Sequence, residues 1–381
     1  MPARQEGFVM NLVDLPVGER SSVKASGLEG VVVADTRLSH VDGERGELLI
    51  AGSRVEELAL QDPGHFETVV ERLLSLGTAE PEPPLRERLA QARVSAFARI
   101  EQFQHALSLP DAMDALLAAT AQGCAGGDTL SVLGALPVYV AAGARLRAKR
   151  SPIAPDATSF TARDFMSMLG LPENVARARA LDAYFVTVSD HGLNASTFAA
   201  RVVASTGSDV MPCIVAGLGA LKGPLHGGAP GPVLDMLDAT ENTEPRVWLE
   251  GELGAGRRIM GMGHRIYRVR DPRALVFERA LLRLAAEDRA PSAVAARIAH
   301  ARRVERAAEA LLSERHPDRP LRANVEFYTA LLLEAVGIPR ELFTATFAIG
   351  RSAGWLAHIA EQRHTGRLIR PAARYVGSWP D

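Results

Sequence analysis

The segment Leu221-Lys222-Gly223-Pro224-Leu225-His226-Gly227-Gly228-Ala229-Pro230 is the part of the chain from which the rest can be interpreted. It follows an apolar run, 214–218, that is typical of a buried helix. Three glycines and two prolines surround one histidine, so the backbone can turn sharply and a rigid loop presents the His226 side chain. The pattern alone fits two interpretations equally well: a helix end with a bystander histidine, or a histidine placed for chemistry.

Length, composition and charge are those of an ordinary globular protein. The chain has 381 residues, of which 47% are apolar and 23% charged, and its formal net charge is −2. A chain of this length can bury a sizeable core in one large domain or in two. A net charge near zero gives no general attraction to nucleic acid or to an anionic membrane, so we expect neither as a partner.

Cysteines and apolar segments indicate the compartment. Cys124 and Cys213 stand alone, so neither a disulfide framework nor a thiolate metal cluster is expected. Residues 1–11 lack a basic region followed by an apolar stretch, which predicts no secretory signal. The longest apolar run, 130–144, contains Pro137 and two glycines and is too short and interrupted to span a bilayer. We therefore expect a cytoplasmic protein.

Hydrophobic periodicity predicts a mostly helical chain with little sheet. Near the N-terminus, the β-branched run 31–36, the turn residues 41–46 and the apolar run 48–51 predict a strand, a turn and a second strand. Elsewhere, apolar residues at helical spacing lie between capping residues, glycines and prolines. Helices are expected at 66–76, 85–104, 110–122, 130–150 with a break near Pro137, 181–188, 197–205, 208–222, 232–237, 245–252, within 275–315, 326–336 and 342–361.

Four of the ten histidines lie beside glycine or aromatic residues: His191, His226, His264 and His358. The other six lie in charged or unremarkable contexts and are expected on the surface; they are His40, His65, His105, His300, His316 and His364. No two of the first four share the short helical spacing that zinc sites favour. General acid–base chemistry therefore fits these histidines better than a metal site.

The segment Asn324-Val325-Glu326-Phe327-Tyr328 offers a carboxylate for such chemistry at the start of a predicted helix. Two loop histidines and a carboxylate can polarise one carbonyl while removing a proton elsewhere. An acid in the first turn of a helix is also favourable for the helix itself. The segment alone leaves both interpretations of Glu326 open.

Gly261-Met262-Gly263 forms a glycine-rich loop directly before His264. Its backbone N–H groups can take a nucleotide base or a phosphate, although no predicted strand precedes it, which excludes a dinucleotide-binding fingerprint. Four arginines follow closely: Arg265, Arg268, Arg270 and Arg273. An anionic ligand and a solvated charged loop explain them equally well.

Together these segments resemble the motifs of the citrate synthase family, in family order along nearly the whole chain. They are Gly27-Leu28-Glu29-Gly30-Val31, Asp42-Gly43-Glu44-Arg45-Gly46, Asp190-His191-Gly192 with Asn194-Ala195-Ser196-Thr197-Phe198, Gly223-Pro224-Leu225-His226-Gly227-Gly228, residues 261–267 with Asp271-Pro272-Arg273, residues 324–328, Phe347-Ala348-Ile349-Gly350-Arg351 with Gly354-Trp355, and Arg370-Pro371 with Tyr375-Val376-Gly377.

The resemblance implies an all-α fold with a short N-terminal β-hairpin. It further implies a large domain made of residues 1–227 and 338–381, a smaller domain of residues 228–337 that closes over substrate, and a homodimer. The implied reaction is the condensation of acetyl-CoA with oxaloacetate and water to citrate and CoA. The thioester is a substrate in that reaction, and neither a cofactor nor a metal is implied.

Roles follow by motif position. His226 would hydrogen-bond the thioester carbonyl, His264 would polarise the keto group of oxaloacetate, and Glu326 would remove the methyl proton. Oxaloacetate would be held by His191, Arg273 and Arg351, with Arg370 reaching in from the partner subunit. Coenzyme A would lie against Gly261, Met262, Gly263 and Arg265.

One departure from the family pattern concerns chemistry, because Glu326 stands where the family usually has aspartate. The additional methylene moves the carboxylate by on the order of 1 Å, and a displacement of that size can cost ~100-fold in rate. Two alternatives to citrate formation therefore stay open: a 2-methylcitrate synthase that uses propionyl-CoA, and a weakly active or non-catalytic protein that binds CoA or a dicarboxylate.

Overall fold

The structure is a computed structural model that describes residue 28 and residues 31–61, 65–77, 85–226, 230–263, 266–267, 269–287, 291–318 and 321–380. By its internal contacts the chain divides into two units, Met1–Thr36 and Arg37–Asp381. In the first unit, the described residues 31–36 form neither helix nor strand. The prediction of a strand in this run is wrong, because Val32 is 85% exposed and the run joins no strand ladder.

A small antiparallel sheet opens the second unit, in the order β1 (Ser39–Asp42), β2 (Glu47–Ile50) and β3 (Ser53–Arg54). The Asp42 carboxylate accepts hydrogen bonds from the N–H groups of Glu44 (3.0 Å) and Arg45 (2.9 Å). This is the turn chemistry expected of an Asx residue. The predicted β-hairpin is therefore present, with its first strand later in the chain than the valine run.

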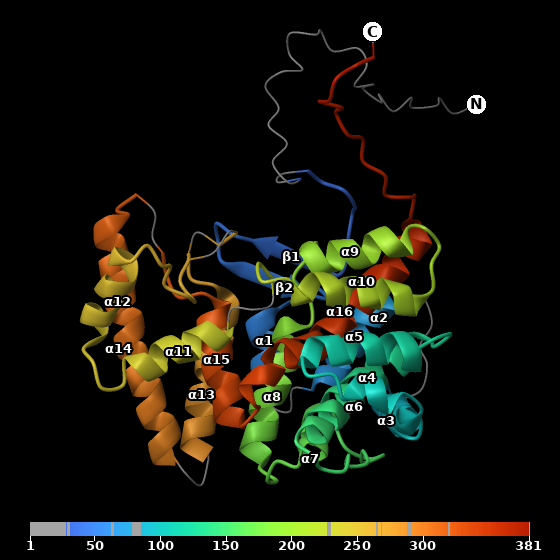
Figure 1. The fold of residues 1–381 in the computed structure, drawn as a ribbon, viewed down its shortest axis with the longest axis horizontal. Helices are drawn as coiled ribbons and strands as arrows, with labels where there is room; N and C mark the ends of the chain where they lie inside the picture. The colour runs from blue at the N-terminus through green and yellow to red at the C-terminus, as the bar shows by residue number, and fades with distance from the viewer. Residues whose placement is uncertain are drawn as a thin grey trace. The chain divides into compact units, whose positions relative to one another are not determined.

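The rest of the described chain is mostly helical, which confirms the all-α class (Figure 1). The α-helices are α1 (Val55–Leu60), α2 (Phe66–Gly77), α3 (Leu85–Phe97), α4 (Gln104–Leu107), α5 (Ala112–Gly123), α6 (Thr129–Arg147), α7 (Thr161–Leu169), α8 (Val175–Val188), α9 (Ala195–Ala204), α10 (Val210–Lys222), α11 (Pro230–Ala239), α12 (Pro245–Gly254), α13 (Pro272–Glu287), α14 (Pro291–Arg315), α15 (Val325–Val336) and α16 (Phe343–Thr365), with 3₁₀ turns η3 (Ile100–Phe103) and η4 (Arg340–Leu342).

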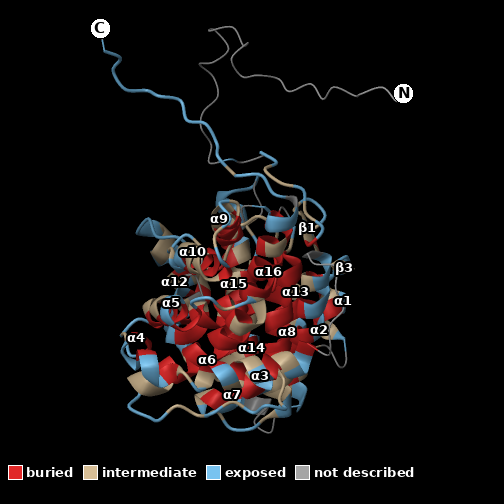
Figure 2. Cartoon of the chain, turned by 90° about the vertical axis from the view of Figure 1, so that its right-hand side faces the viewer, coloured by how far each residue is buried: buried red, intermediate tan, exposed pale blue. Residues whose placement is uncertain are grey.

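Helix α8 lies at the centre of the helical packing. It contacts α1, α7, α13, α15 and α16, and Figure 2 shows buried residues concentrated around α8, α13, α15 and α16. Helices α11 to α15 gather at the left of Figure 1 and fall within the predicted smaller domain, 228–337. Independent movement of that domain stays a prediction.

The predicted break of α6 at Pro137 is wrong, because the helix continues from Thr129 to Arg147 with the proline inside it. By length and hydropathy α6 could cross a membrane, but 67% of its apolar window is buried. It packs against α3, α5 and α7. At Gly134 an added Cβ would lie 2.6 Å from the Ala92 Cβ, so glycine permits the close contact with α3. In this structure α6 is a core helix.

One histidine prediction is also wrong. His300 is buried on α14. Its Nε2 lies 3.0 Å from the carbonyl oxygen of Leu237, on α11, and 3.1 Å from the hydroxyl of Thr240, which directly follows α11. Two polar partners on a neighbouring element satisfy the ring, and such partners are invisible in the local sequence. His65 is half-buried and stacks on Phe160 with ring centroids 3.8 Å apart. The other four are exposed as predicted: His40, His105, His316 and His364.

Candidate active site

Two glycines on α16 bring this helix close to the end of α8. A Cβ at Gly350 would lie 2.6 Å from Val188 Cγ2, and a Cβ at Gly354 would lie 2.3 Å from the Ser189 carbonyl oxygen. Real side chains do not tolerate such distances, so glycine is required at both positions. The close approach puts Arg351, between the two glycines, against the last turn of α8. Its Nε donates to the Val188 carbonyl oxygen at 2.7 Å.

A second buried arginine begins α13. Arg273 donates from Nε (3.0 Å) and Nη2 (2.8 Å) to the two carboxylate oxygens of Asp271, a bidentate pair that fixes the guanidinium plane. Its Cζ lies 5.8 Å from the Tyr267 ring centroid. The Tyr267 hydroxyl lies 3.1 Å from Nε2 of His191, which follows α8. His191, Tyr267 and Arg273 thus form a connected buried group.

Glu326 lies in the first turn of α15, whose N-cap is Asn324. The Asn324 side chain accepts the Glu326 N–H at 2.9 Å and donates to the Gly263 carbonyl oxygen at 2.8 Å. The backbone also links the two segments, because the Asn324 N–H donates to the Gly261 carbonyl oxygen at 2.9 Å and the Gly263 N–H donates to Arg322 at 2.7 Å. The glycine loop and the start of α15 are therefore one local structure.

The electrostatics of Glu326 suit a base at neutral pH. Burial raises the pKa of the Glu326 carboxyl to about 7, although the positive charge of Arg273 opposes the shift, as does that of Arg351. Burial lowers the pKa of Arg351 to about 10, opposed by the negative charge of Asp190, so this guanidinium stays charged at pH 7. Burial would also lower the pKa of Arg273, but the Asp271 carboxylate outweighs it and raises the pKa. A titratable carboxyl thus faces two fixed positive charges.

His226 lies on the loop after α10 and faces α9. The backbone N–H of Ser196 donates to its Nε2 at 3.3 Å, and the Ser196 hydroxyl lies 2.8 Å from the same nitrogen. The Trp355 indole N–H donates to that hydroxyl at 3.2 Å. Burial lowers the pKa of His226 to about 4, and the charge of Arg351 adds to the shift. The ring is therefore neutral at pH 7; the donor from Ser196 assigns its proton to Nδ1, which is then a hydrogen-bond donor.

Behind Arg351 lies a network of polar side chains, most of them buried. The Asp190 carboxylate accepts from the Ser39 hydroxyl of β1 (2.5 Å) and lies 3.2 Å from Nε2 of His358. Nδ1 of His358 lies 2.8 Å from Arg201 Nη1, which donates to Glu361 at 2.5 Å. Burial would raise the pKa of Asp190, but the neighbouring His358 outweighs it, helped by Arg351, and the pKa lies below the usual range. The network ties β1, α8, α9 and α16 together beneath the site.

Comparison with known proteins identifies the family. A family model described as "Citrate synthase, C-terminal domain" matches residues 27–372. The chain belongs to the citrate synthase family. It is 38% identical over 362 residues to "Putative citrate synthase 2" of Mycobacterium tuberculosis, a match that covers 93% of each chain. It is 34% identical over 373 residues to the citrate synthase of Haloferax volcanii, covering 92% of this chain and 95% of that one.

Solved structures of the family share the fold. The citrate synthase of Thermotoga maritima superposes with a TM-score of 0.78 at 32% identity, covering 94% of this chain and 97% of that one. The enzyme of Thermoplasma acidophilum, solved with carboxymethyl coenzyme A and oxaloacetate, gives a TM-score of 0.82 at 26% identity and covers the same shares. The all-α citrate synthase fold is thus established for this chain.

The structure brings together most of the side chains that the citrate synthase motifs predict. His191 and Arg273 belong to one bonded group, and Arg351 shifts the pKa values of both Glu326 and His226. Gly261, Met262 and Gly263 pair with the segment before α15. His264 and Arg265 lie outside the described residues. Arg370 is exposed on the segment after α16, and among the described residues it is not part of this group.

Sequence reasoning assigned no role to two residues that the structure places in this site, Ser196 and Asp190. Ser196 is visible in sequence only as a capping-type residue, because its partner His226 is 30 positions away. Asp190 directly precedes His191 in the Asp-His-Gly motif, and this position in the motif could have identified it as a site residue.

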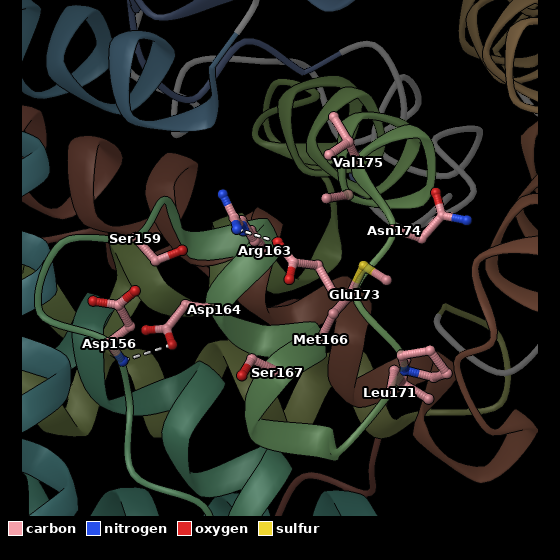
Figure 3. Close-up of a pocket in the computed structure, with 12 residues that line it drawn as sticks. Asp156, Ser159, Arg163, Asp164, Met166, Ser167, Leu171, Glu173, Asn174 and Val175 are labelled. Carbon is pink, nitrogen blue, oxygen red and sulfur yellow. Dashed lines mark hydrogen bonds and ion pairs between the residues drawn. The ribbon is translucent and has the colours of Figure 1, made fainter. Parts of the chain in front are cut away.

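A separate pocket of about 160 Å³ lies between the loop before α7, α7 itself and the start of α8 (Figure 3). In it the Asp156 N–H donates to Asp164 at 2.9 Å, and Arg163 pairs with Glu173. None of the predicted citrate synthase site residues lines this pocket. Among the described residues, no group of three or more histidine, cysteine or acidic side chains is arranged to hold a metal ion.

Proposed function

We propose that the protein condenses acetyl-CoA with oxaloacetate and water to give citrate and CoA. The observation that carries the proposal is the Glu326 carboxyl, which has a pKa of about 7 and interacts with the charges of two buried arginines, Arg273 and Arg351. A general base is most effective when its pKa is close to the working pH. A dicarboxylate needs fixed guanidinium groups, and the same two arginines supply them.

In the proposed reaction, Arg273 and Arg351 bind the two carboxylates of oxaloacetate. Asp271 and the Val188 carbonyl hold these guanidinium groups in place before substrate arrives, so little ordering is left to occur on binding. His191, oriented by Tyr267, adds a hydrogen bond to the same ligand. His264 polarises the keto carbonyl, as the family motif implies.

Enolisation of the thioester follows. Glu326 removes a proton from the acetyl methyl group while Nδ1–H of His226 donates to the thioester oxygen, where negative charge develops. A neutral imidazole suits this task, because its pKa of about 4 keeps it uncharged at pH 7 and its hydrogen bond strengthens as the oxyanion forms.

Carbon–carbon bond formation and hydrolysis complete the proposed reaction. The enol carbon attacks the polarised keto carbon, whose oxygen takes a proton and becomes the citrate hydroxyl. Water then adds to the thioester carbonyl and the C–S bond breaks, which releases CoA as the thiol. No electron donor or acceptor is required, so we propose a reaction that uses side chains and the thioester alone.

The glycine loop links the proposed coenzyme A site to the proposed base, Glu326, through hydrogen bonds to Asn324. Gly261 and Gly263 have φ angles of +76° and +77°, which only glycine adopts without strain. Asn324 bonds both glycine residues and caps the helix of Glu326. A CoA thioester bound at Gly261, Met262, Gly263 and Arg265 would therefore be held at a fixed position relative to the Glu326 carboxylate. We further propose a homodimer in which Arg370 completes the partner's site, and closure of residues 228–337 over the substrates.

Release of free thiol from the CoA thioester tests the proposal. The wild-type protein should release CoA from acetyl-CoA only when oxaloacetate is present, and Glu326→Gln should lower kcat by ~100-fold or more, the usual contribution of a general base. Oxaloacetate binding should persist in Glu326→Gln, because the arginines remain. Glu314→Gln is the matched control, since Glu314 is an exposed acid on α14 paired with Arg246.

The same assay separates the alternatives. Faster thiol release from propionyl-CoA than from acetyl-CoA would assign the protein to 2-methylcitrate formation instead. Thioester binding without thiol release from either substrate would exclude both enzymes and leave the non-catalytic interpretation.

A further inference from the structure

The hydroxyl of Tyr184 is a buried donor without a hydrogen-bond partner among the described residues. The side chain is fully buried in the last two turns of α8. Leaving a buried polar group unbonded costs about 1–3 kcal/mol, and buried tyrosine hydroxyls usually find a partner. A partner that is present only in the working enzyme would explain why this hydroxyl is retained in an apolar helix.

Two packing relations place Tyr184 beneath the proposed site. Tyr184 and Val188 are four residues apart and share a face of α8, and the Val188 carbonyl holds Arg351. On the other side, the Tyr184 ring packs against Phe277 with centroids 5.3 Å apart. Phe277 lies one turn after Arg273 on the same face of α13. The tyrosine is therefore one helical turn from Val188, which binds Arg351, and in contact with Phe277, which is one helical turn from Arg273.

The Glu326 carboxylate is the negative charge that acts on this hydroxyl. Helix α15 packs directly on α8. Burial raises the pKa of Tyr184, the negative charge of Glu326 raises it further, and Arg351 opposes the shift. The phenol is thus neutral and keeps its proton as a donor. The Glu326 carboxylate, for its part, accepts no hydrogen bond from the described residues, since only its backbone N–H is bonded.

We propose that Tyr184 is a positioning residue for Glu326, whose carboxylate accepts a hydrogen bond from the Tyr184 hydroxyl when the substrates are bound. This inference rests on the proposed function. The bond would hold the longer glutamate side chain, fix the direction of its free oxygen toward the methyl proton, and favour the ionised carboxylate. It accounts for how a glutamate can replace the shorter aspartate usual in the family.

Tyr184→Phe in the full-length protein tests the inference. The substitution removes only the hydroxyl, so the unfolding temperature should stay the same or rise, because an unbonded buried group is lost. The kcat for thiol release should fall by ~10- to 100-fold, the value of a hydrogen bond to a charged group. KM for oxaloacetate should stay unchanged, and the acid limb of the pH–rate profile should move to higher pH because the ionised carboxylate loses a donor.

Two controls sharpen the test. Tyr139→Phe removes the hydroxyl of another buried tyrosine, which lies 4.0 Å from the Cys124 sulfur and belongs to the α5–α6 core; its kcat and pH profile should match the wild type. In a Glu326→Asp background the carboxylate is shorter by one methylene and would lie farther from the phenol, so adding Tyr184→Phe should change kcat far less than it does beside glutamate.

Three results would overturn the inference. Wild-type kcat and an unmoved acid limb in Tyr184→Phe would show that the hydroxyl does not act on Glu326. A raised KM for oxaloacetate with unchanged kcat would assign the hydroxyl to substrate binding. If the wild-type protein releases no CoA from acetyl-CoA or propionyl-CoA, the proposed function fails and this inference fails with it, an outcome distinct from an active wild type with an unaffected variant.

Discussion

Replacing Gly354 by alanine should damage both the stability and the proposed activity of this protein. The added Cβ would lie 2.3 Å from the Ser189 carbonyl oxygen and 2.6 Å from Asp190 Oδ1, whereas ordinary contacts begin at 3.4 Å. The two helices must separate by about 1 Å to admit it, and overpacking of this kind costs about 1–3 kcal/mol. Gly354 also donates its N–H to Ser189 at 3.0 Å, and that bond would lengthen.

The kinetic effect follows from what the displaced segment carries. Ser189 and Asp190 directly precede His191, and Arg351 lies on the turn of α16 before Gly354. A displacement of ~1 Å between such groups costs about 100-fold in rate. We therefore expect Gly354→Ala to lower kcat/KM for oxaloacetate by that order and to lower the midpoint of thermal unfolding.

Steady-state thiol release and thermal unfolding, measured on the same preparation, check this prediction. Gly251→Ala is the matched control, because Gly251 lies inside α12 with nothing within 4 Å of an added Cβ. That change should stabilise the helix by up to about 1 kcal/mol and leave kinetics unaltered. Wild-type stability and kinetics in Gly354→Ala would refute the claim that this glycine sets the spacing of α8 and α16.

Three further predictions concern charge and assembly. The proposed base must be ionised, so kcat/KM should fall as pH drops through about 7, the pKa of Glu326, and His226, with a pKa of about 4, should add no limb between pH 5 and 8. Asp190 has a lowered pKa in the folded chain, so its contribution to stability is present above the usual carboxyl range and is lost as pH falls below it; Asp190→Asn should lower the free energy of unfolding at pH 7 by about 3–5 kcal/mol, as for a broken buried pair. In denaturant titrations at several pH values, the free energy of unfolding of this variant should also depend less on pH in the acid range. Mixing inactive Glu326→Gln with inactive Arg370→Ala should restore about a quarter of the wild-type activity if Arg370 acts across a symmetric dimer, since half of each mixed dimer is then intact; no restoration after subunit exchange would assign Arg370 to its own subunit or to no site.

Much of this site was readable from the sequence because its residues sit in local motifs. The Asp-His-Gly, Leu-His-Gly-Gly and Asn-Val-Glu segments each join a functional side chain to the glycine or capping residue that presents it. Asn324 is an example: the same residue predicts the start of α15 and holds Glu326 in its first turn. Hydrogen bonds of this kind join residues that are adjacent in sequence, so the sequence alone can predict them.

Other predictions failed where the deciding contact comes from a distant segment. The valine run 31–36 has strand propensity, yet strand formation needs a partner, and residues 39–42 have one instead. His300 lies in a charged helix and was predicted on the surface, but Leu237 and Thr240 satisfy it in the interior. Pro137 does not break α6, because the surrounding core helices hold that helix together.

The sequence by itself determined the helical class of this protein, the order of its motifs and the identity of the proposed base, His226 and the arginines. Only the tertiary structure decided the pKa values and protonation states of those groups. The raised pKa of Glu326, the neutral state of His226 and the raised pKa of Tyr184 all depend on burial and on charges from helices far apart in the chain. Desolvation and Coulomb interaction act through distance in space, and the sequence records only distance along the backbone.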